Sequence, residues 1–206
     1  MNDMEKKEKS SLRKKADSIK EFRCKNLIAV LEDPKDIKNI GQTIRNINAL
    51  GVEKLYIIDS KNLVPDDWTE MRTDEILTRV SSSANRWSFI KKFNSTQDCI
   101  NHLHKKGFLS MVTSPHLKGR KNILLHEGKY TRMRLAVWFG NESRGVSEMA
   151  IKNSVACINI PMYGIIESLN LGTSTGIVFY EIAKQRRAYK MSKTTKRKEK
   201  HKEIGR

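Results

Sequence analysis

The chain has 206 residues, of which 38% are hydrophobic and 31% charged, and its formal net charge is +17. This length can build one domain with a substantial core but is short for two independent domains. No stretch approaches about 20 consecutive apolar residues, and the charged first residues lack the apolar run of a secretory signal. We therefore expect a soluble, cytoplasmic protein without a membrane-spanning helix.

The three cysteines, Cys24, Cys99 and Cys157, are odd in number and widely spaced, and none lies in a C-x-x-C motif. This pattern predicts neither a disulfide framework nor a zinc site. The five histidines also lack the spacing of metal ligands. We expect no bound metal.

Positive charge is concentrated at the two ends of the chain. Residues 1–25 hold nine Lys or Arg against five Asp or Glu, and residues 184–206 hold eleven against two. A nearly balanced centre with two basic arms is typical of a folded body that engages a polyanion such as RNA or DNA. For the last fifteen residues, a solvated tail that only aids solubility is the alternative.

Residues 1–25 have a partly helical, amphipathic pattern, and from residue 26 onward short apolar runs alternate with helix-like segments. The expected strands are 26–32, 54–59, 87–93, 107–114, 134–142 and 155–162, and the expected helices are 36–50, 95–106, 147–153 and 168–187. This alternation predicts an α/β domain with a mainly parallel sheet flanked by helices and joined by right-handed crossovers. The polar segment 60–86 has little periodicity and predicts a long loop with one helical turn.

The helix-like segment NIGQTIRNINALG, residues 39–51, has two distinct faces. Its three isoleucines follow the spacing of a core stripe, while Asn39, Gln42 and Arg45 form a polar stripe on another face. On a helix edge, Arg45 could contact a phosphate or a ribose. An ordinary solvated arginine is the alternative.

A second polar segment, AVWFGNESRGVSE at residues 136–148, follows an apolar strand. Gly140 and Gly145 allow its backbone to turn sharply or to approach a ligand. The segment has neither the G-x-G-x-x-G spacing of dinucleotide folds nor the Lys-Ser/Thr of a P-loop, so a nucleotide pyrophosphate is not indicated. A tight strand-to-helix turn explains one glycine but does not explain Glu142.

The third segment, ESLNLGTSTGIVFYE at residues 167–181, opens the last expected helix. A glycine inside a helix costs roughly 1 kcal/mol relative to alanine, so Gly172 and Gly176 need a reason beyond propensity. With Ser168 they form a small-residue stripe, which indicates that another segment packs at close range. Ser168 and Asn170 would lie in the first helical turn, where an N-cap role for Ser168 is the alternative to a functional one.

Together, N-x-G-x-x-x-R at Asn39–Arg45, F-G-N-E-S-R-G at Phe139–Gly145 and I-P-M-x-x-x-x-E-S-L-N at Ile160–Asn170 resemble the three motifs of the SpoU-TrmH family. The resemblance covers about residues 26–187. Members of this family are SPOUT-class methyltransferases, which transfer a methyl group from S-adenosylmethionine to a ribose 2′-hydroxyl of RNA. The resemblance therefore implies a SPOUT-type α/β knot, in which the C-terminal part of the chain is threaded through a loop as a trefoil knot and the last motif wraps the cofactor.

The resemblance also implies roles for individual residues. It assigns the catalytic site to Arg45, Asn39, Glu142, Ser168 and Asn170. It assigns cofactor binding to Thr113, Phe139, Gly140, Asn141, Gly145, Ile160, Met162 and Leu169. Because a guanidinium group stays protonated, we interpret Arg45 as an electrostatic stabiliser of the developing ribose alkoxide and leave the proton acceptor open between a phosphate and water.

Within the family, the two basic arms resemble those of members that methylate guanosine 18 in the D-loop of tRNA, and SSSANRW at residues 81–87 resembles a loop of the same members. The implied organisation is an N-terminal arm, 1–25, a methyltransferase domain, 26–187, and a basic tail, 188–206. The implied partners are tRNA, gripped by Arg13, Lys14, Arg186 and Arg187, and a second copy in a homodimer. Two alternatives stay open: methylation of ribosomal RNA or another tRNA position, and a nonenzymatic RNA-binding protein with the same fold.

Overall fold

The computed structural model describes residues 10–116, 121–131 and 134–204, with side chains described as far as residue 195. Its centre is a seven-stranded sheet in the order β3-β2-β1-β6-β4-β7-β5, in which every neighbouring pair is parallel. The strands are β1 (Cys24–Glu32), β2 (Val52–Ile58), β3 (Phe89–Phe93), β4 (Leu109–Thr113), β5 (Asn122–Leu124), β6 (Leu135–Phe139) and β7 (Ala156–Asn159). The α/β fold with a parallel sheet is therefore confirmed.

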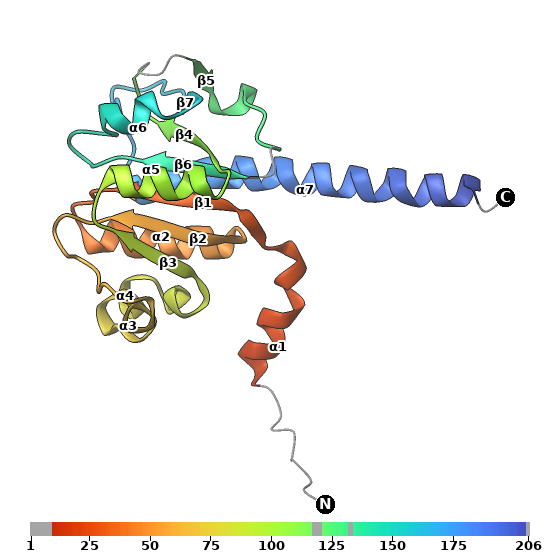
Figure 1. Ribbon diagram of the computed structural model, residues 1–206, viewed down its shortest axis with the longest axis horizontal. Helices are drawn as coiled ribbons and strands as arrows, with labels where there is room; N and C mark the ends of the chain where they lie inside the picture. Colours follow the sequence, from red (N-terminus) through yellow and green to blue (C-terminus); the bar gives the residue numbers. More distant parts are fainter. Residues whose placement is uncertain (1–9, 117–120, 132–133, 205–206) are drawn as a thin grey trace, which may run out of the picture.

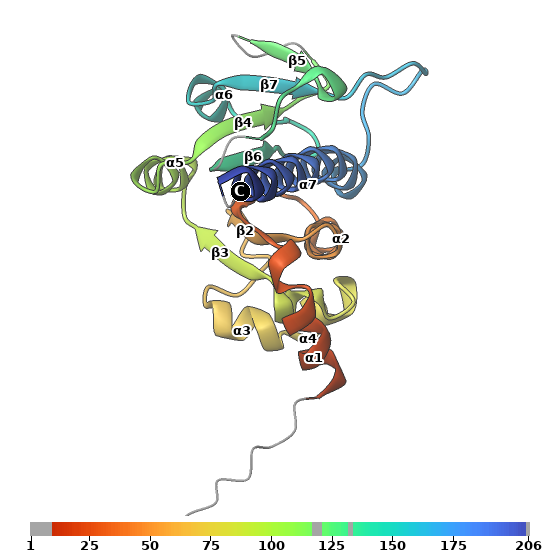
Figure 2. The same ribbon diagram turned by 90° about the vertical axis from the view of Figure 1, so that its right-hand side faces the viewer.

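Helices cover both faces of this sheet (Figures 1 and 2). In Figure 2, α5 and α6 lie on one side of the sheet, and α2 and α7 lie on the other. The helices are α1 (Ser11–Ser18), α2 (Ile37–Ala49), α3 (Trp68–Thr73), α4 (Glu75–Val80), α5 (Thr96–Lys105), α6 (Glu148–Lys152) and α7 (Leu171–Ile204). Three short 3-10 helices are η1 (Lys20–Phe22), η2 (Ala84–Trp87) and η3 (Leu125–Glu127).

The core is divided into two layers by the period-2 alternation of the strands. Residues 27–31 of β1 are all fully buried: Leu27, Ala29 and Leu31 pack on the side of α2 and α7, while Ile28 and Val30 pack on the side of α5. A strand that is apolar on both faces fits only inside a sheet that is covered on both sides. This burial explains why the run NLIAVLE lacks alternation in the sequence.

The segment 60–86 is more ordered than its sequence suggests, so the prediction of a loop with one turn was wrong. It contains α3, α4 and the start of η2, and Asp67 and Asp74 cap the two helices by accepting hydrogen bonds from Thr69 N at 2.9 Å and Leu77 N at 2.6 Å. The buried amide of Asn85 donates to Met71 O at 2.9 Å, which ties η2 to α3. Helices of six residues are too short to show a 3.6-residue periodicity.

The last helix, α7, differs from its prediction at both ends. It begins at Leu171, three residues later than expected, and it continues past residue 187, where the helix was expected to end, to Ile204. Figure 1 shows the distal part of α7 extending beyond the sheet, and α1 projecting from the body in another direction. The trefoil knot implied by the family resemblance stays a prediction, as do the three-part domain boundaries.

In the described part of the chain, none of the helices combines the length and the apolar character that crossing a membrane requires.

Candidate active site

A cavity of about 480 Å³ lies at the carboxyl edge of the sheet, where open parallel sheets bind their ligands. Its walls come from the segments that follow β4, β6 and β7 and from the first turn of α7. All eight residues predicted to bind the cofactor line it, and so do Glu142, Ser168 and Asn170 from the predicted catalytic set. Further lining residues that the sequence analysis did not single out are Ser114, Pro115, His116, Ser143, Arg144, Ile158, Glu167, Leu171 and Ser174.

The loop after β6 forms one wall of this cavity as a tight, internally bonded turn. Asn141 N donates to Gly145 O at 3.0 Å, and Gly145 N donates back to Asn141 O at 2.8 Å. Gly145 has φ +70°, a left-handed conformation that favours glycine. A Cβ on Gly140 would overlap the backbone of Gly145 and Val146. Both glycines are therefore required by the shape of the turn, which brings bare backbone to the cavity wall.

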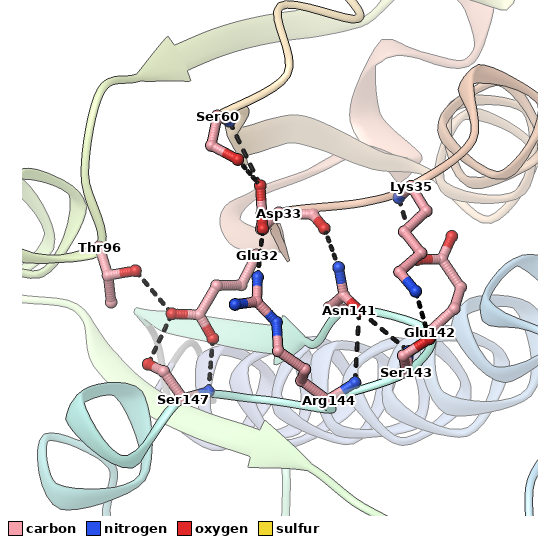
Figure 3. Close-up of polar contacts among 10 residues, drawn as sticks. All are labelled: Glu32, Asp33, Lys35, Ser60, Thr96, Asn141, Glu142, Ser143, Arg144 and Ser147. Carbon is pink, nitrogen blue, oxygen red and sulfur yellow. Dashed lines mark hydrogen bonds and ion pairs between the residues drawn. The ribbon is translucent and has the colours of Figure 1, made fainter.

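The side chain of Asn141 makes its hydrogen bonds to the protein backbone. Its Oδ1 accepts hydrogen bonds from Ser143 N at 2.9 Å and Arg144 N at 3.3 Å, and its Nδ2 donates to Asp33 O at 2.6 Å (Figure 3). The protein itself therefore occupies the oxygen of this amide and one of its two N–H groups. Asn141 shapes the loop with its side chain.

A chain of hydrogen bonds connects the three sequence motifs. Asn39 Nδ2 donates to Glu142 Oε1 at 2.6 Å, and Asn170 Nδ2 donates to Asn39 Oδ1 at 3.0 Å. The second oxygen of Glu142 accepts from Lys35 N at 2.9 Å. Both asparagines donate through their amide nitrogen and accept through their amide oxygen, and Glu142 accepts through both of its oxygens, so the orientations of the two amides are fixed. The network thereby connects α2, the loop after β6 and the start of α7.

Asn170, and not Ser168, caps helix α7. Its Oδ1 accepts hydrogen bonds from Gly172 N at 2.8 Å and Thr173 N at 3.4 Å. The N-cap interpretation of Ser168 was therefore wrong, because the helix begins at Leu171 and leaves Ser168 exposed in the preceding segment at the cavity.

Arg45 lies outside the cavity, in a separate depression between α2 and α7 that is lined by Gln42, Arg45, Asn46, Gly172, Thr173, Gly176 and Ile177. Its side chain is exposed and has no hydrogen-bond or ion-pair partner in the described part of the chain. Its charge is therefore available to a ligand. Asn39 sits on the same helix but faces the cavity network, so α2 carries groups of the candidate site on two of its faces.

The close packing predicted from the two glycines of α7 is confirmed. A Cβ on Gly172 would lie 2.8 Å from Gln42 Cβ, and one on Gly176 would lie 3.3 Å from Asn46 Nδ2. Asn46 Nδ2 also donates to Gly172 O at 2.7 Å. The segment that approaches α7 is α2, so the glycines set the distance between the helix that bears Arg45 and the helix that begins at the cavity.

The four residues predicted to contact RNA differ in their surroundings. Arg13 and Lys14 lie exposed on α1, and Arg187 is exposed on α7 with its guanidinium donating to Leu50 O at 2.9 Å. Arg186 is half-buried: its Nε donates to Tyr130 O at 3.0 Å, and burial lowers the pKa of its guanidinium. Arg186 thus anchors α7 to the body, whereas the RNA role of all four stays a prediction.

Within the described residues, His, Cys, Asp and Glu form no group of three that could hold a metal ion. Residues near the cavity that the sequence analysis missed include Glu32, the last residue of β1, and Asp33 and Lys35, which follow it. Their position in the sequence could have indicated them, because polar residues that end a buried parallel strand lie at the ligand-binding edge of the sheet.

Comparison with known proteins agrees with this geometry. The sequence profile of the SpoU rRNA Methylase family matches residues 26–180. A tRNA (guanosine(18)-2'-O)-methyltransferase of Aquifex aeolicus is 28% identical over 173 residues, which span 84% of this chain and 76% of that protein. The crystal structure of the A. aeolicus TrmH/SpoU tRNA modifying enzyme has a TM-score of 0.71 and 26% identity, covering 88% of this chain and 87% of that one.

An AdoMet-bound rRNA methyltransferase from Sinorhizobium meliloti shares the fold, with a TM-score of 0.65 and 22% identity over 81% of this chain and 59% of that one. The motifs, the cavity that they enclose and the profile match agree over most of the sequence. The chain belongs to the SpoU methylase family.

Proposed function

We propose that the protein transfers a methyl group from S-adenosylmethionine to a ribose 2′-hydroxyl of tRNA, with guanosine 18 as the target. The observation that carries the proposal is the hydrogen-bonded chain Glu142–Asn39–Asn170, which joins the cavity to the helix that bears Arg45. A protein that only binds RNA needs its basic arms but has no need of this chain. The A. aeolicus relative is named for methylation of guanosine 18, which supports the choice of target.

The residues of the cavity fit S-adenosylmethionine. A volume of about 480 Å³ is in the range of small-molecule sites. Apolar side chains, including Phe139, Ile160 and Met162, provide surface for the adenosine, and the bare backbone around Gly140 and Gly145 offers polar groups at close range. When bound, the cofactor supplies a methyl group that its sulfonium makes electrophilic.

The chain's own task is to hold and activate the ribose. Because a guanidinium group carries a fixed positive charge and no acceptor, Arg45 stabilises negative charge that develops on the 2′-oxygen and does not act as a base. Its exposed position and its lack of a partner in the described structure suit that role. Ser168 presents a hydroxyl to the cavity, and the proton of the 2′-hydroxyl leaves to water or to an RNA phosphate.

The basic ends serve to bind tRNA. Arg13 and Lys14 on α1 and Arg187 on α7 are exposed cations, and the 184–206 segment holds eleven Lys or Arg. Binding through such groups releases counterions and therefore weakens steeply with salt. We further propose that the active form is a cytoplasmic homodimer with the trefoil knot of its family.

The deciding experiment measures methyl transfer from labelled S-adenosylmethionine to unmodified tRNA transcripts and maps the modified ribose. We expect 2′-O-methylguanosine at position 18 and no transfer to a transcript in which this guanosine is replaced. Transfer to ribosomal RNA or to another tRNA position would keep the chemistry and change the substrate. A folded protein that binds RNA but does not bind S-adenosylmethionine and methylates no RNA would overturn the proposal.

A further inference from the structure

Glu32, the last residue of β1, holds a buried carboxylate that none of the site residues described so far contacts directly. Only 5% of its surface is exposed. Its oxygens accept three hydrogen bonds, from Ser147 N at 2.7 Å, Ser147 Oγ at 2.6 Å and Thr96 Oγ1 at 2.6 Å (Figure 3). In the described chain it has no ion-pair partner within 4.0 Å. A buried carboxylate is costly unless hydrogen bonds compensate it, and the two donors of Ser147 supply most of that compensation here.

The next residue, Asp33, contacts the same loop from a second direction. Its carbonyl oxygen accepts from Asn141 Nδ2 at 2.6 Å, and its carboxylate accepts from Arg144 Nη2 at 2.5 Å and from Ser60 Oγ. Asp33 has φ +54°, an uncommon conformation for a residue other than glycine. This conformation lets the main chain of Asp33 and the side chain of Glu32 reach the loop together.

These contacts fasten both ends of the loop that forms one wall of the cavity. Asn141 lies at the start of the loop and Ser147 at its end, where Ser147 also caps α6 by accepting from Ala150 N at 3.1 Å. Neither Glu32 nor Asp33 lines the cavity. Any effect that they have on a bound ligand must therefore pass through the position of the loop.

We infer that Glu32 is a positioning residue for cofactor binding: its carboxylate fixes the 140–147 loop, through Ser147, in the shape that receives S-adenosylmethionine. This inference rests on the proposed function for the identity of the ligand. Thr96 belongs to α5 and not to the loop, yet it makes the same kind of hydrogen bond to the same carboxylate at the same length as Ser147 Oγ. The two donors provide a matched comparison.

The test compares Glu32→Gln, Ser147→Ala, Thr96→Val and Ser95→Ala. Glutamine offers one acceptor oxygen and an unwanted NH₂ to three donors. Ser147→Ala removes a loop donor and also the cap of α6, whereas Ser95→Ala removes an equivalent cap, on Asp98 N at 3.1 Å, from a helix away from the cavity. Thr96→Val removes the α5 donor and leaves the loop donors in place.

The readouts are the dissociation constant of S-adenosylmethionine by calorimetry, its KM against kcat, and hydrogen exchange of residues 140–147 without cofactor. Loss of a charge-assisted hydrogen bond predicts that Glu32→Gln and Ser147→Ala raise the dissociation constant about 10-fold or more. We expect KM to rise more than kcat falls, and loop exchange to accelerate. Thr96→Val and Ser95→Ala should leave both the dissociation constant and the exchange within about twofold of the parent.

Unchanged loop exchange and cofactor affinity in Ser147→Ala would overturn the inference, and so would equal effects of Thr96→Val and Ser147→Ala. If Glu32→Gln does not fold, the Ser147→Ala and Thr96→Val pair still decides. If the parent protein does not bind S-adenosylmethionine, the proposed function fails. Hydrogen exchange then still determines whether Glu32 holds the loop, because that measurement needs no cofactor.

Discussion

The packing of α7 against α2 predicts opposite consequences for two similar substitutions, Gly172→Ala and Gly176→Ala. Each adds one methyl group to the same face of the same helix, and each gains up to about 1 kcal/mol of helix propensity. At Gly172 the new Cβ would lie 2.8 Å from Gln42 Cβ and 3.1 Å from its Cδ, and closer still to Oε1. Such overpacking costs about 1–3 kcal/mol, which leaves a net loss of about 0–2 kcal/mol.

At Gly176 the nearest atom is Asn46 Nδ2 at 3.3 Å, followed by Asn46 Cγ at 3.6 Å. A shift of a few tenths of an ångström relieves this contact, so we expect stability between neutral and about 1 kcal/mol above the parent. Urea unfolding at equal protein concentration would measure the difference between the two variants, expected near 2 kcal/mol. Equal stability, or a Gly172→Ala variant more stable than the parent, would refute the reasoning.

The same pair has a functional consequence. Because Gly172 and Gly176 both border the depression that contains Arg45, a displaced α2 would move the guanidinium relative to the cavity. Gly172→Ala should therefore lower methyl transfer more than Gly176→Ala does.

Arg45→Ala should lower turnover about 100-fold or more while the S-adenosylmethionine dissociation constant changes less than about threefold, because Arg45 lies outside the cavity. Calorimetry and single-turnover rates measure the two quantities, and a matching loss of cofactor affinity would contradict this role. Asn170→Asp keeps an acceptor for the cap of α7 but loses the amide donor to Asn39, so activity should fall while the free energy of unfolding stays within about 0.5 kcal/mol of the parent. Asn170→Ala also removes the cap, so its free energy of unfolding, measured with denaturant, should fall by about 1 kcal/mol. Burial, followed by nearby lysines, lowers the pKa of His102 below its usual 6.5, so the unfolded chain binds this proton first. The free energy of unfolding should then fall as the pH falls through 6.5, and His102→Phe should flatten that part of the pH profile; an unchanged slope would exclude the effect.

The sheet could be predicted from the sequence because its signals are local. Residues 27–31 form an unbroken apolar run, and burial on both faces of a parallel strand permits little else. The short helices α3 and α4 could not be predicted in the same way, since each has six residues and buries one apolar side chain, Met71 or Leu77, which is too few to show a helical period. The sequence of the distal part of α7, residues 193–203, has no apolar residue, so it has no hydrophobic periodicity from which a helix could be predicted.

The residues of the candidate site could be predicted from the sequence, but the contacts between their side chains could not. Glu142 and Asn39 are 103 positions apart, and Asn39 and Asn170 are 131 apart, so no local pattern pairs their side chains. Ser168 and Asn170 can both cap a helix, and the position where the helix begins decides between them.

Arg186 and Arg187 illustrate a second limit. They are neighbours of identical chemistry, yet Arg186 is half-buried against the Tyr130 carbonyl whereas Arg187 is exposed. Only the packing of the body around α7 distinguishes the half-buried arginine from the exposed one. The position of Glu32 was likewise visible in the sequence, but its contact with Ser147, 115 positions later, was not.

Helix α7 has 34 residues and, at 1.5 Å per residue, is about 50 Å long. Leu171 at one end lines the cavity, and the distal part of α7 extends beyond the sheet (Figure 1). The helix therefore sets a fixed distance between the cavity and the basic end of the chain. A ligand that contacts both ends at once must be extended over a similar distance, so we expect an RNA too short to span it to reach the depression of Arg45 without contacting the far end of α7.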